Sequence, residues 1–184
     1  MLPSEPAALA PILITGGTGL IGSTLAKQLG GGGRRVVCFD PTPPQGVDHN
    51  SSCHYVAGDV RDADMVDQWV RTCGTVIHLA AVVGVDEYLQ RATEVLDVNI
   101  LGARNVLEAC WRHDRPVVLA STSEVYGKND DDLREDAAAV YGPPSVGRWC
   151  YAVAKAAAEH YAFALGARGL RFVVVRYFNV YGPT

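Results

Sequence analysis

Near its start the chain reads Ile12-Leu13-Ile14-Thr15-Gly16-Gly17-Thr18-Gly19-Leu20-Ile21-Gly22, an apolar run followed by a glycine-rich turn and the opening of a helical pattern. Glycines let the backbone turn sharply and approach a pyrophosphate closely, while the first turn of a helix offers unpaired N–H groups and a partial positive charge. A glycine turn by itself is weak evidence, because tight turns of this composition also occur without a ligand. Here the preceding strand and the following helix supply the context that a dinucleotide site requires.

The rest of the chain repeats this alternation of short apolar runs and helical patterns. We expect strands at 11–15, 36–39, 54–57, 75–81, 116–121 and 170–177, and helices at 20–29, 63–70, 92–113 and 151–167. The runs lack polar alternation, which is typical of strands buried on both faces of a parallel sheet. The sequence therefore predicts an α/β fold with a doubly wound, Rossmann-like parallel sheet that binds ligands at the carboxyl ends of its strands.

Length and composition limit the class of protein. The 184 residues suit one domain, with 48% hydrophobic residues, 20% charged residues and a net charge of -4. Sixteen basic residues against twenty acidic ones give no excess positive field for a nucleic-acid backbone. No apolar run reaches the roughly 18 residues of a membrane span, and residues 1–11 lack the features of a secretory signal. We therefore expect a soluble cytoplasmic protein that binds neither nucleic acid nor membrane.

The cysteines and acidic residues form no metal-binding pattern. The five cysteines are odd in number, widely scattered and without a C-x-x-C pair, so we expect free thiols at Cys38, Cys53, Cys73, Cys110 and Cys150. The run Asp130-Asp131-Asp132 is interpreted as a solvated loop, because consecutive carboxylates do not converge without a fold to aim them. No metal site is expected.

Two aspartates follow predicted strands. Asp40 ends the second strand, where its carboxylate can accept hydrogen bonds from both hydroxyls of an adenosine ribose. It would repel a 2′-phosphate, and no arginine follows to compensate, so the pattern favours NAD over NADP. Asp59 follows the third strand and could reach the adenine amino group, although an aspartate after a strand is about as often a helix cap.

Tyr151 and Lys155 lie four residues apart at the start of the predicted last helix, so both point from one face. An ammonium beside a phenol lowers the pKa of the phenol, and we expect this effect to make Tyr151 a general base. With only three lysines in the chain, an accidental pair at this spacing would be rare. A pair on the protein surface is the remaining alternative.

Ser121-Thr122-Ser123-Glu124 follow a predicted buried strand, at the edge where a doubly wound sheet binds ligands. A hydroxyl group there can share a proton network with Tyr151, and Glu124 can act on a substrate carbon or bind an ordered water. The alternative is a Ser/Thr turn with a capping glutamate.

Together these segments resemble the extended short-chain dehydrogenase/reductase family, the NAD-dependent nucleotide-sugar epimerases, dehydratases and decarboxylases. The matching segments run in family order: residues 15–22, Asp59-Val60, His78-Leu79-Ala80-Ala81, Asn99, residues 121–127, Tyr151 with Lys155, and residues 176–183. The resemblance implies a catalytic triad of Thr122, Tyr151 and Lys155. It implies an NAD site at Gly16, Gly19, Leu20, Ile21, Gly22, Asp40, Asp59, Val60, Leu79, Ala80, Ala81, Asn99, Tyr151, Lys155 and Tyr177.

Within this family the motifs look most like those of the UDP-glucuronate decarboxylases. The 4,6-dehydratases carry an Asp-Glu pair after the triad threonine, whereas Ser123-Glu124 follow Thr122 here, as in those decarboxylases. Arg148-Trp149-Cys150-Tyr151 is similar to a motif of two of them, but the Asn-Pro that follows their substrate-contacting tyrosine is replaced by Arg91-Ala92. The resemblance implies that a UDP-sugar contacts Tyr88, Thr122 and Asn179.

The chemistry implied by the resemblance is oxidation of a nucleotide sugar at C4, with Tyr151 taking the hydroxyl proton and NAD taking the hydride. In a glucuronate the new ketone lies β to the carboxylate, so carbon dioxide can leave, and Ser123 and Glu124 beside the carboxylate would favour its loss. A UDP-hexose 4-epimerase would share the first step. A non-catalytic NAD-binding module is the third alternative.

Two further expectations concern domain organisation and partners. Family members continue into a smaller substrate-binding domain, so residues 1–184 are interpreted as the NAD-binding Rossmann domain, with the C-terminal substrate domain missing or truncated. We expect NAD binding with little turnover from this chain alone. The helices at 92–113 and 151–167 are rich in small apolar residues, and family members commonly pair them across a homodimer, although packing on the sheet alone would also explain them.

Overall fold

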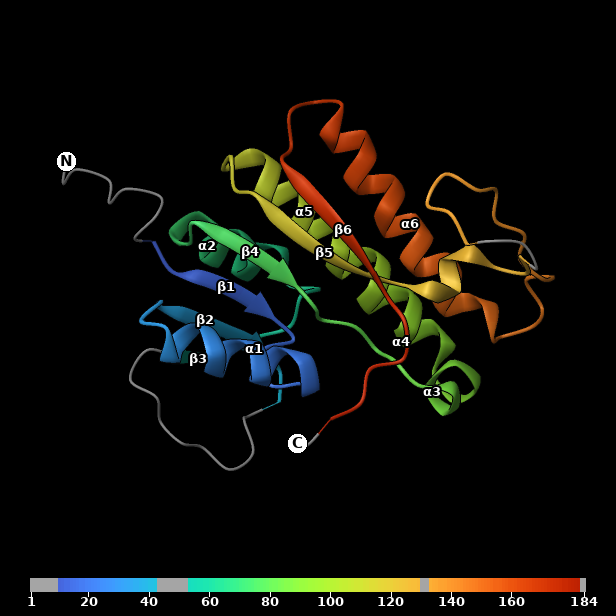
Figure 1. Ribbon diagram of the computed structural model, residues 1–184, viewed down its shortest axis with the longest axis horizontal. Coiled ribbons are helices and arrows are strands. Elements are labelled where there is room, and N and C mark those ends of the chain that lie inside the picture. The colour runs from blue at the N-terminus through green and yellow to red at the C-terminus, as the bar shows by residue number, and fades with distance from the viewer. Residues whose placement is uncertain (1–9, 43–52, 130–132, 183–184) are drawn as a thin grey trace.

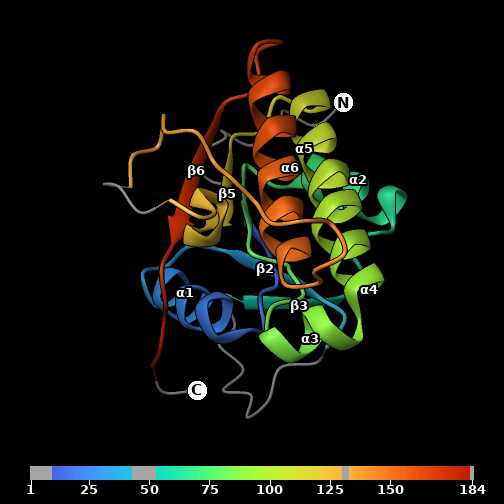
Figure 2. The ribbon, with the colours of Figure 1, turned by 90° about the vertical axis from the view of Figure 1, so that its right-hand side faces the viewer.

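The computed structural model describes residues 10–42, 53–129 and 133–182. In this part of the chain a six-stranded parallel sheet has the strand order β3-β2-β1-β4-β5-β6, and helices pack on its two faces (Figures 1 and 2). The predicted α/β, doubly wound, Rossmann-like fold is confirmed. The N-terminal segment 1–9 and the acidic run at 130–132 lie outside the described residues.

The elements follow the predicted alternation. The strands are β1 (Ile12–Thr15), β2 (Val36–Asp40), β3 (Cys53–Ala57), β4 (Thr75–His78), β5 (Val117–Thr122) and β6 (Phe172–Tyr177). The α-helices are α1 (Leu20–Gly31), α2 (Ala63–Thr72), α3 (Val85–Gln90), α4 (Ala92–Leu96), α5 (Ala103–Arg112) and α6 (Trp149–Gly166). A π-helix, Asp97–Gly102, joins α4 to α5, and a 3-10 helix, Ser123–Tyr126, follows β5.

β1 lies where the strand order reverses. It pairs in parallel with β2 on one side and with β4 on the other. Every residue of β1 and β2 is buried, as expected for strands without polar alternation. The connections after β1 and β4 leave in opposite directions, which opens a ligand crevice at the carboxyl ends of these strands.

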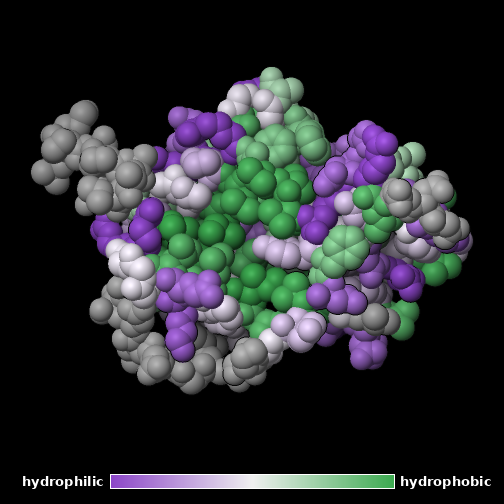
Figure 3. Space-filling model, viewed as in Figure 1, coloured by the Kyte–Doolittle hydropathy of each residue, from purple (hydrophilic) through white to green (hydrophobic). Residues whose placement is uncertain are grey.

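Two helical layers enclose the sheet. Alternate residues of β1 face opposite layers: Leu13 packs in the core beneath α2, α5 and α6, whereas Ile12 and Ile14 pack against α1. Figure 2 shows α2, α5 and α6 side by side on one face. On the other face α1 packs against β1 to β3, and apolar residues of β4 to β6 gather on the surface (Figure 3), among them Val173, which is 57% exposed.

The expectation of one continuous helix over 92–113 is wrong in its middle. The backbone widens into a π-helix at Asp97–Gly102, and Asn99 in this segment is buried. The Asn99 amide accepts a hydrogen bond from Val82 N at 3.0 Å and donates one to Val82 O at 3.1 Å. A π-helix holds one more residue per hydrogen-bonded turn than an α-helix. The spacing of apolar residues does not predict this widening, which accompanies the tertiary contact between Asn99 and Val82.

A buried ion pair ties β5, α6 and β6 together. Arg176 of β6 donates to the Glu159 carboxylate of α6 from Nη2 at 2.7 Å and from Nε at 3.0 Å. Ser121 of β5 donates to Glu159 Oε1 at 2.5 Å. The side chains of Glu159 and Arg176 are 7% and 18% exposed. Because Tyr151 and Lys155 lie on the same helix two turns and one turn before Glu159, this node fixes where they meet the sheet.

Two further features of the described residues bear on function. All five cysteines are free thiols. No group of three or more His, Cys, Asp or Glu side chains in the described part could hold a metal ion, and no helix there has the length and apolar character needed to cross a membrane.

We predict that Glu159→Gln lowers the free energy of unfolding by about 3 kcal/mol, because it leaves the Arg176 guanidinium largely buried without an anion. Glu108→Gln, which breaks the exposed Arg104–Glu108 pair of α5, is the control and should cost less than about 0.5 kcal/mol. Urea unfolding of both variants measures the difference. Equal losses would contradict the structural role of Glu159.

Candidate functional site

The turn between β1 and α1 is shaped for a close backbone approach. Gly16 has a φ of +72°, and a Cβ atom there would lie 2.7 Å from Ala80 N. A Cβ atom on Gly22 would lie 2.1 Å from Gly16 O, so both positions require glycine. α1 begins after Gly19 with no side-chain cap and no acidic residue in its first turn. The N–H groups at its start are therefore available to an anion such as a pyrophosphate.

Asp40 lies beside this turn, at the end of β2. Its side chain accepts hydrogen bonds from Thr18 N at 3.3 Å and from Thr42 N at 2.9 Å, and the residue is buried. Two N–H donors leave part of the acceptor capacity of a carboxylate unused. A carboxylate fixed at the end of the second strand, next to a glycine turn, fits the ribose of a dinucleotide.

Asp59 follows β3 and is not a helix cap, because Asp62 fills that role by accepting a hydrogen bond from Met65 N at 3.0 Å. The Asp59 carboxylate instead pairs with Arg61, two residues later. The hydrogen bond with the Arg61 side chain is the main cause that lowers the pKa of Asp59. The alternative of a capping role for Asp59 is therefore wrong.

A cavity of about 660 Å³ extends from the start of α1 to the carboxyl end of β5. Predicted site residues that line it are Gly19, Leu20, Ile21, Leu79, Ala81, Tyr88, Thr122, Ser123, Glu124, Tyr151, Lys155, Tyr177 and Asn179. Predicted residues outside its lining are Gly16, Gly22, Asp40, Asp59, Val60, Ala80 and Asn99. The start of α1 and the Tyr151–Lys155 pair, far apart in sequence, thus share one cavity, whose volume lies in the range of small-molecule and cofactor sites.

Lys155 is buried within this cavity wall. Its ammonium donates a hydrogen bond to Ala120 O at 3.0 Å, and burial lowers the pKa of Lys155 to about 8. Sequence reasoning missed the contribution of Ala120, because a backbone carbonyl at the end of a strand carries no signal in the residue type. A lysine held in this way is still protonated at neutral pH and places a positive charge against the cavity.

Tyr151 stacks against Tyr88 of α3. The two rings are nearly parallel, 8° apart, with centroids separated by 5.1 Å. The pKa of Tyr151 is raised to about 12, chiefly by burial and then by Tyr88, while the hydrogen bond with Thr122 lowers it. The expectation that Lys155 brings the pKa of Tyr151 down is wrong for this structure, because the Lys155 ammonium points to the Ala120 carbonyl and burial dominates.

Thr122 has two roles. Its Oγ1 accepts a hydrogen bond from Glu124 N at 3.2 Å and so caps the 3-10 helix that follows β5. The same residue lines the cavity together with Ser123 and Glu124. The segment Thr122–Glu124 therefore both forms the Ser/Thr turn and lines the cavity with polar side chains.

His78 is a buried residue of the site region to which sequence reasoning gave no role. Its Nδ1 and Thr15 Oγ1 share a hydrogen bond of 2.7 Å, which joins the ends of β4 and β1. Its Nε2 has no partner among the described residues. Burial, and secondarily Lys155, lower the pKa of His78 to about 3, so the imidazole is neutral. The available signal was a histidine inside the otherwise apolar predicted strand 75–81.

We predict that Lys155→Met raises the free energy of unfolding at pH 7 by on the order of 3 kcal/mol, because the buried ammonium titrates near pH 8 in the folded state and near 10.5 in the unfolded state. The unfolded chain binds the proton more tightly, so the native protein gains stability between these pH values. The gap between the variant and the native protein should therefore close above about pH 10.5. Urea unfolding from pH 6 to pH 11 measures it.

The exposed residue Lys27 of α1 offers a matched control. Lys27→Met should change the free energy of unfolding by less than about 0.5 kcal/mol at every pH. A Lys155→Met curve parallel to the native curve over the whole pH range would show that burial does not perturb this lysine.

Comparisons with known proteins agree with this geometry. A family model described as the NAD dependent epimerase/dehydratase family matches residues 12–184. The chain is 35% identical over 175 residues to UDP-N-acetyl-alpha-D-glucosaminuronate decarboxylase of Bacillus cytotoxicus. This match covers 93% of this chain and 54% of that protein.

Two solved structures show the same fold. MoeE5 in complex with UDP-glucuronic acid and NAD is 35% identical, with a TM-score of 0.81 over 94% of this chain and 56% of that one. The Thermus thermophilus UDP-glucose 4-epimerase complex with NAD is 34% identical, with a TM-score of 0.78 over 94% of this chain and 56% of that one. The chain spans about half the length of each of these relatives.

Proposed function

Because the chain belongs to the NAD-dependent epimerase/dehydratase family, we propose that it forms the cofactor-binding half of an enzyme that modifies a nucleotide sugar. NAD is the cofactor of this family. The observation that carries the proposal is the cavity that joins the uncapped start of α1 to Thr122, Tyr151 and Lys155. A redox-sensing module would need the first feature but not a buried lysine and a buried phenol on one wall.

In this proposal the ends of the strands divide the dinucleotide among them. The start of α1, with Gly16, Gly19 and Gly22, binds the pyrophosphate, and Asp40 binds the adenosine ribose. Asp59 and Val60 face the adenine, while Tyr151 and Lys155 face the nicotinamide ribose. The remaining residues of the proposed cofactor site are Leu20, Ile21, Leu79, Ala80, Ala81, Asn99 and Tyr177.

The proposed chemistry begins at C4 of the sugar. NAD, when bound, supplies the acceptor and later the donor of the hydride. Tyr151 takes the proton of the C4 hydroxyl, and Thr122 holds the same oxygen through its own hydroxyl group. In this structure Tyr151, with a pKa of about 12, is protonated at neutral pH, and the Lys155 ammonium donates to Ala120 O. The proposed base role therefore requires Lys155, which lines the same cavity, to turn toward the phenol when NAD and the sugar are bound.

The finer proposal is decarboxylation of a UDP-glucuronate. A ketone at C4 lies β to the uronate carboxylate, so the electrons of the breaking carbon–carbon bond can enter an enolate whose oxygen Thr122 and Tyr151 hold. Ser123 and Glu124 line the cavity directly after Thr122, where a negative charge would favour loss of carbon dioxide. The likeness to a decarboxylase and to MoeE5 bound to UDP-glucuronic acid supports this substrate class.

A UDP-hexose 4-epimerase is the second candidate, supported by the likeness to the Thermus thermophilus enzyme. It would use Tyr151 and Thr122 in the same first step. In this alternative the sugar ketone rotates before reduction, so no carboxylate is required. Tyr88 and Asn179 are proposed sugar contacts in both candidates.

The proposed assembly is a homodimer through α5 and α6. Val153 and Phe163 of α6 remain 42% and 60% exposed, and Trp111 of α5 is 36% exposed. These apolar side chains on neighbouring helices support a contact with a second copy.

We predict that the chain binds NAD at least about tenfold more tightly than NADP, because Asp40 repels a 2′-phosphate. Asp40→Ala should reduce this preference to less than about threefold, measured by isothermal titration with both dinucleotides. Asp62→Ala is the matched control, since it removes a carboxylate that caps α2 and should leave the preference unchanged. No binding of either dinucleotide would overturn the proposed cofactor site.

The substrate is tested with UDP-glucuronate and UDP-glucose, each supplied with NAD, on this chain and on the full product of its gene. We predict release of carbon dioxide from UDP-glucuronate by the full product, and a loss of about a hundredfold or more in Tyr151→Phe. Tyr161→Phe, on the same helix, should keep full activity. Interconversion of UDP-glucose and UDP-galactose without gas release would favour the epimerase instead.

A further inference from the structure

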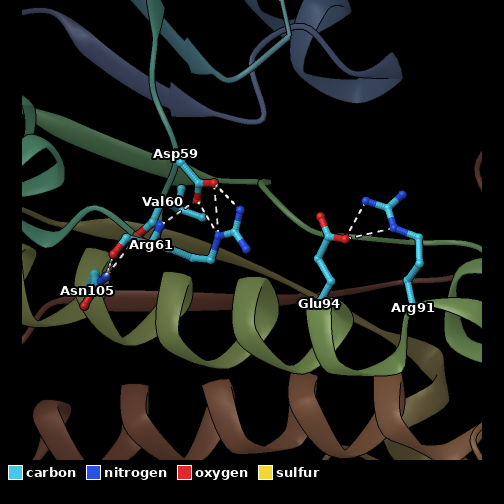
Figure 4. A network of polar contacts seen from close by, with 6 residues as sticks. All are labelled: Asp59, Val60, Arg61, Arg91, Glu94 and Asn105. Carbon is cyan, nitrogen blue, oxygen red and sulfur yellow. Dashed lines mark hydrogen bonds and ion pairs between the residues drawn. The ribbon is translucent and has the colours of Figure 1, made fainter.

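The turn after β3 is fixed from beneath by the helical layer. Asn105 of α5 donates hydrogen bonds from Nδ2 to Val60 O at 3.0 Å and to Arg61 O at 3.1 Å (Figure 4). The Val60 side chain is buried, and a Cβ atom on Gly102 would lie 2.5 Å from Val60 Cγ2. The backbone of Asp59-Val60-Arg61 therefore cannot shift without disturbing α5 and the π-helix.

On this fixed backbone, Arg61 holds the Asp59 carboxylate at several points (Figure 4). Asp59 Oδ1 accepts from Arg61 N at 2.8 Å and from Nε at 3.0 Å. Asp59 Oδ2 accepts from Nε at 3.0 Å and from Nη2 at 2.5 Å. The planar fork of the guanidinium thus sets the plane of the carboxylate, which a single ammonium would not do.

The proton count leaves room for one more donor. A carboxylate offers about four acceptor positions. Arg61 brings three protons to them, from its backbone N, from Nε, which is shared between the two oxygens, and from Nη2. About one acceptor position is then free, in a carboxylate whose side chain is 35% exposed. Asp59 is therefore prepared to receive one N–H group from outside the chain.

The acidic side chains near Arg61 do not compete for its guanidinium. Glu94 of α4 is engaged by Arg91, which donates to it from Nε at 2.8 Å and from Nη2 at 2.5 Å (Figure 4). Asp97 and Glu94 act on Arg61 only as nearby negative charges. Arg91 therefore pairs with Glu94, and Arg61 pairs with Asp59.

We propose that Arg61 is a positioning residue for cofactor recognition, which clamps Asp59 so that its remaining acceptor position meets the amino group of the adenine. The inference rests on the proposed function, which places the adenine at Asp59 and Val60. Arg61 itself contacts Asp59 and is assigned no contact with the cofactor.

The test compares NAD with nicotinamide hypoxanthine dinucleotide, whose purine carries a carbonyl oxygen in place of the amino group. Both are titrated into the 184-residue chain by calorimetry. The native chain should prefer NAD by about tenfold, the typical effect of one hydrogen bond to a charged group. Arg61→Gln should bring this preference below about twofold while changing the affinity for the hypoxanthine analogue by less than about twofold. Arg61→Lys should lose the preference as well, because it keeps the charge but not the fork.

Arg104→Gln is the matched control, since it breaks an exposed ion pair on the neighbouring helix α5 and should leave the preference intact. Thermal unfolding of each variant reports whether the fold is kept. A preference that survives in Arg61→Gln and Arg61→Lys but disappears in Asp59→Ala would overturn the role of Arg61 and leave the adenine site in place. No preference in the native chain, despite tight NAD binding, would overturn the placement of the adenine and the inference with it.

Discussion

The attachment of α6 to the sheet determines the geometry of the candidate site. A buried node of Glu159, Ser121 and Arg176 joins this helix to β5 and β6. One helical turn before Glu159, Lys155 donates a hydrogen bond to the Ala120 carbonyl of β5. A buried ion pair tolerates little displacement, because a small separation leaves charges without partners. The phenol of Tyr151 and the hydroxyl of Thr122 are therefore presented to the cavity by elements that cannot slide past each other.

Burial has opposite effects on the two central groups of the site. It lowers the pKa of Lys155 and raises the pKa of Tyr151, because in each case it disfavours the charged form. The stacked ring of Tyr88 adds to the second effect. Lys155 costs stability in this way, since a methionine would fill the same space without the burial of a charge. Such a costly residue is typical of a functional position.

The two ends of the proposed cofactor site are supported by different layers. The nicotinamide end depends on α6 and β5, whereas the adenine end depends on the turn after β3, which Asn105 and Gly102 hold against α5 and the π-helix. The π-helix contacts two turns at the ends of the strands. Its Gly102 lies against Val60 after β3, and its buried Asn99 hydrogen-bonds the backbone of Val82 after β4. The irregular stretch between α4 and α5 thus has an identifiable structural role.

Sequence alone determined the strand and helix alternation, the parallel sheet and the glycine turn, because buried strands and phosphate-binding turns have local patterns that survive without tertiary context. It also placed Tyr151, Lys155 and Thr122 on consecutive elements at one edge of the sheet. Only the tertiary structure decided which polar groups meet: the Ala120 carbonyl for Lys155, the Tyr88 ring for Tyr151, and Arg61 for Asp59. The sign of the Tyr151 pKa shift followed from those contacts and from burial, and neither is encoded in the spacing of a tyrosine and a lysine along a helix.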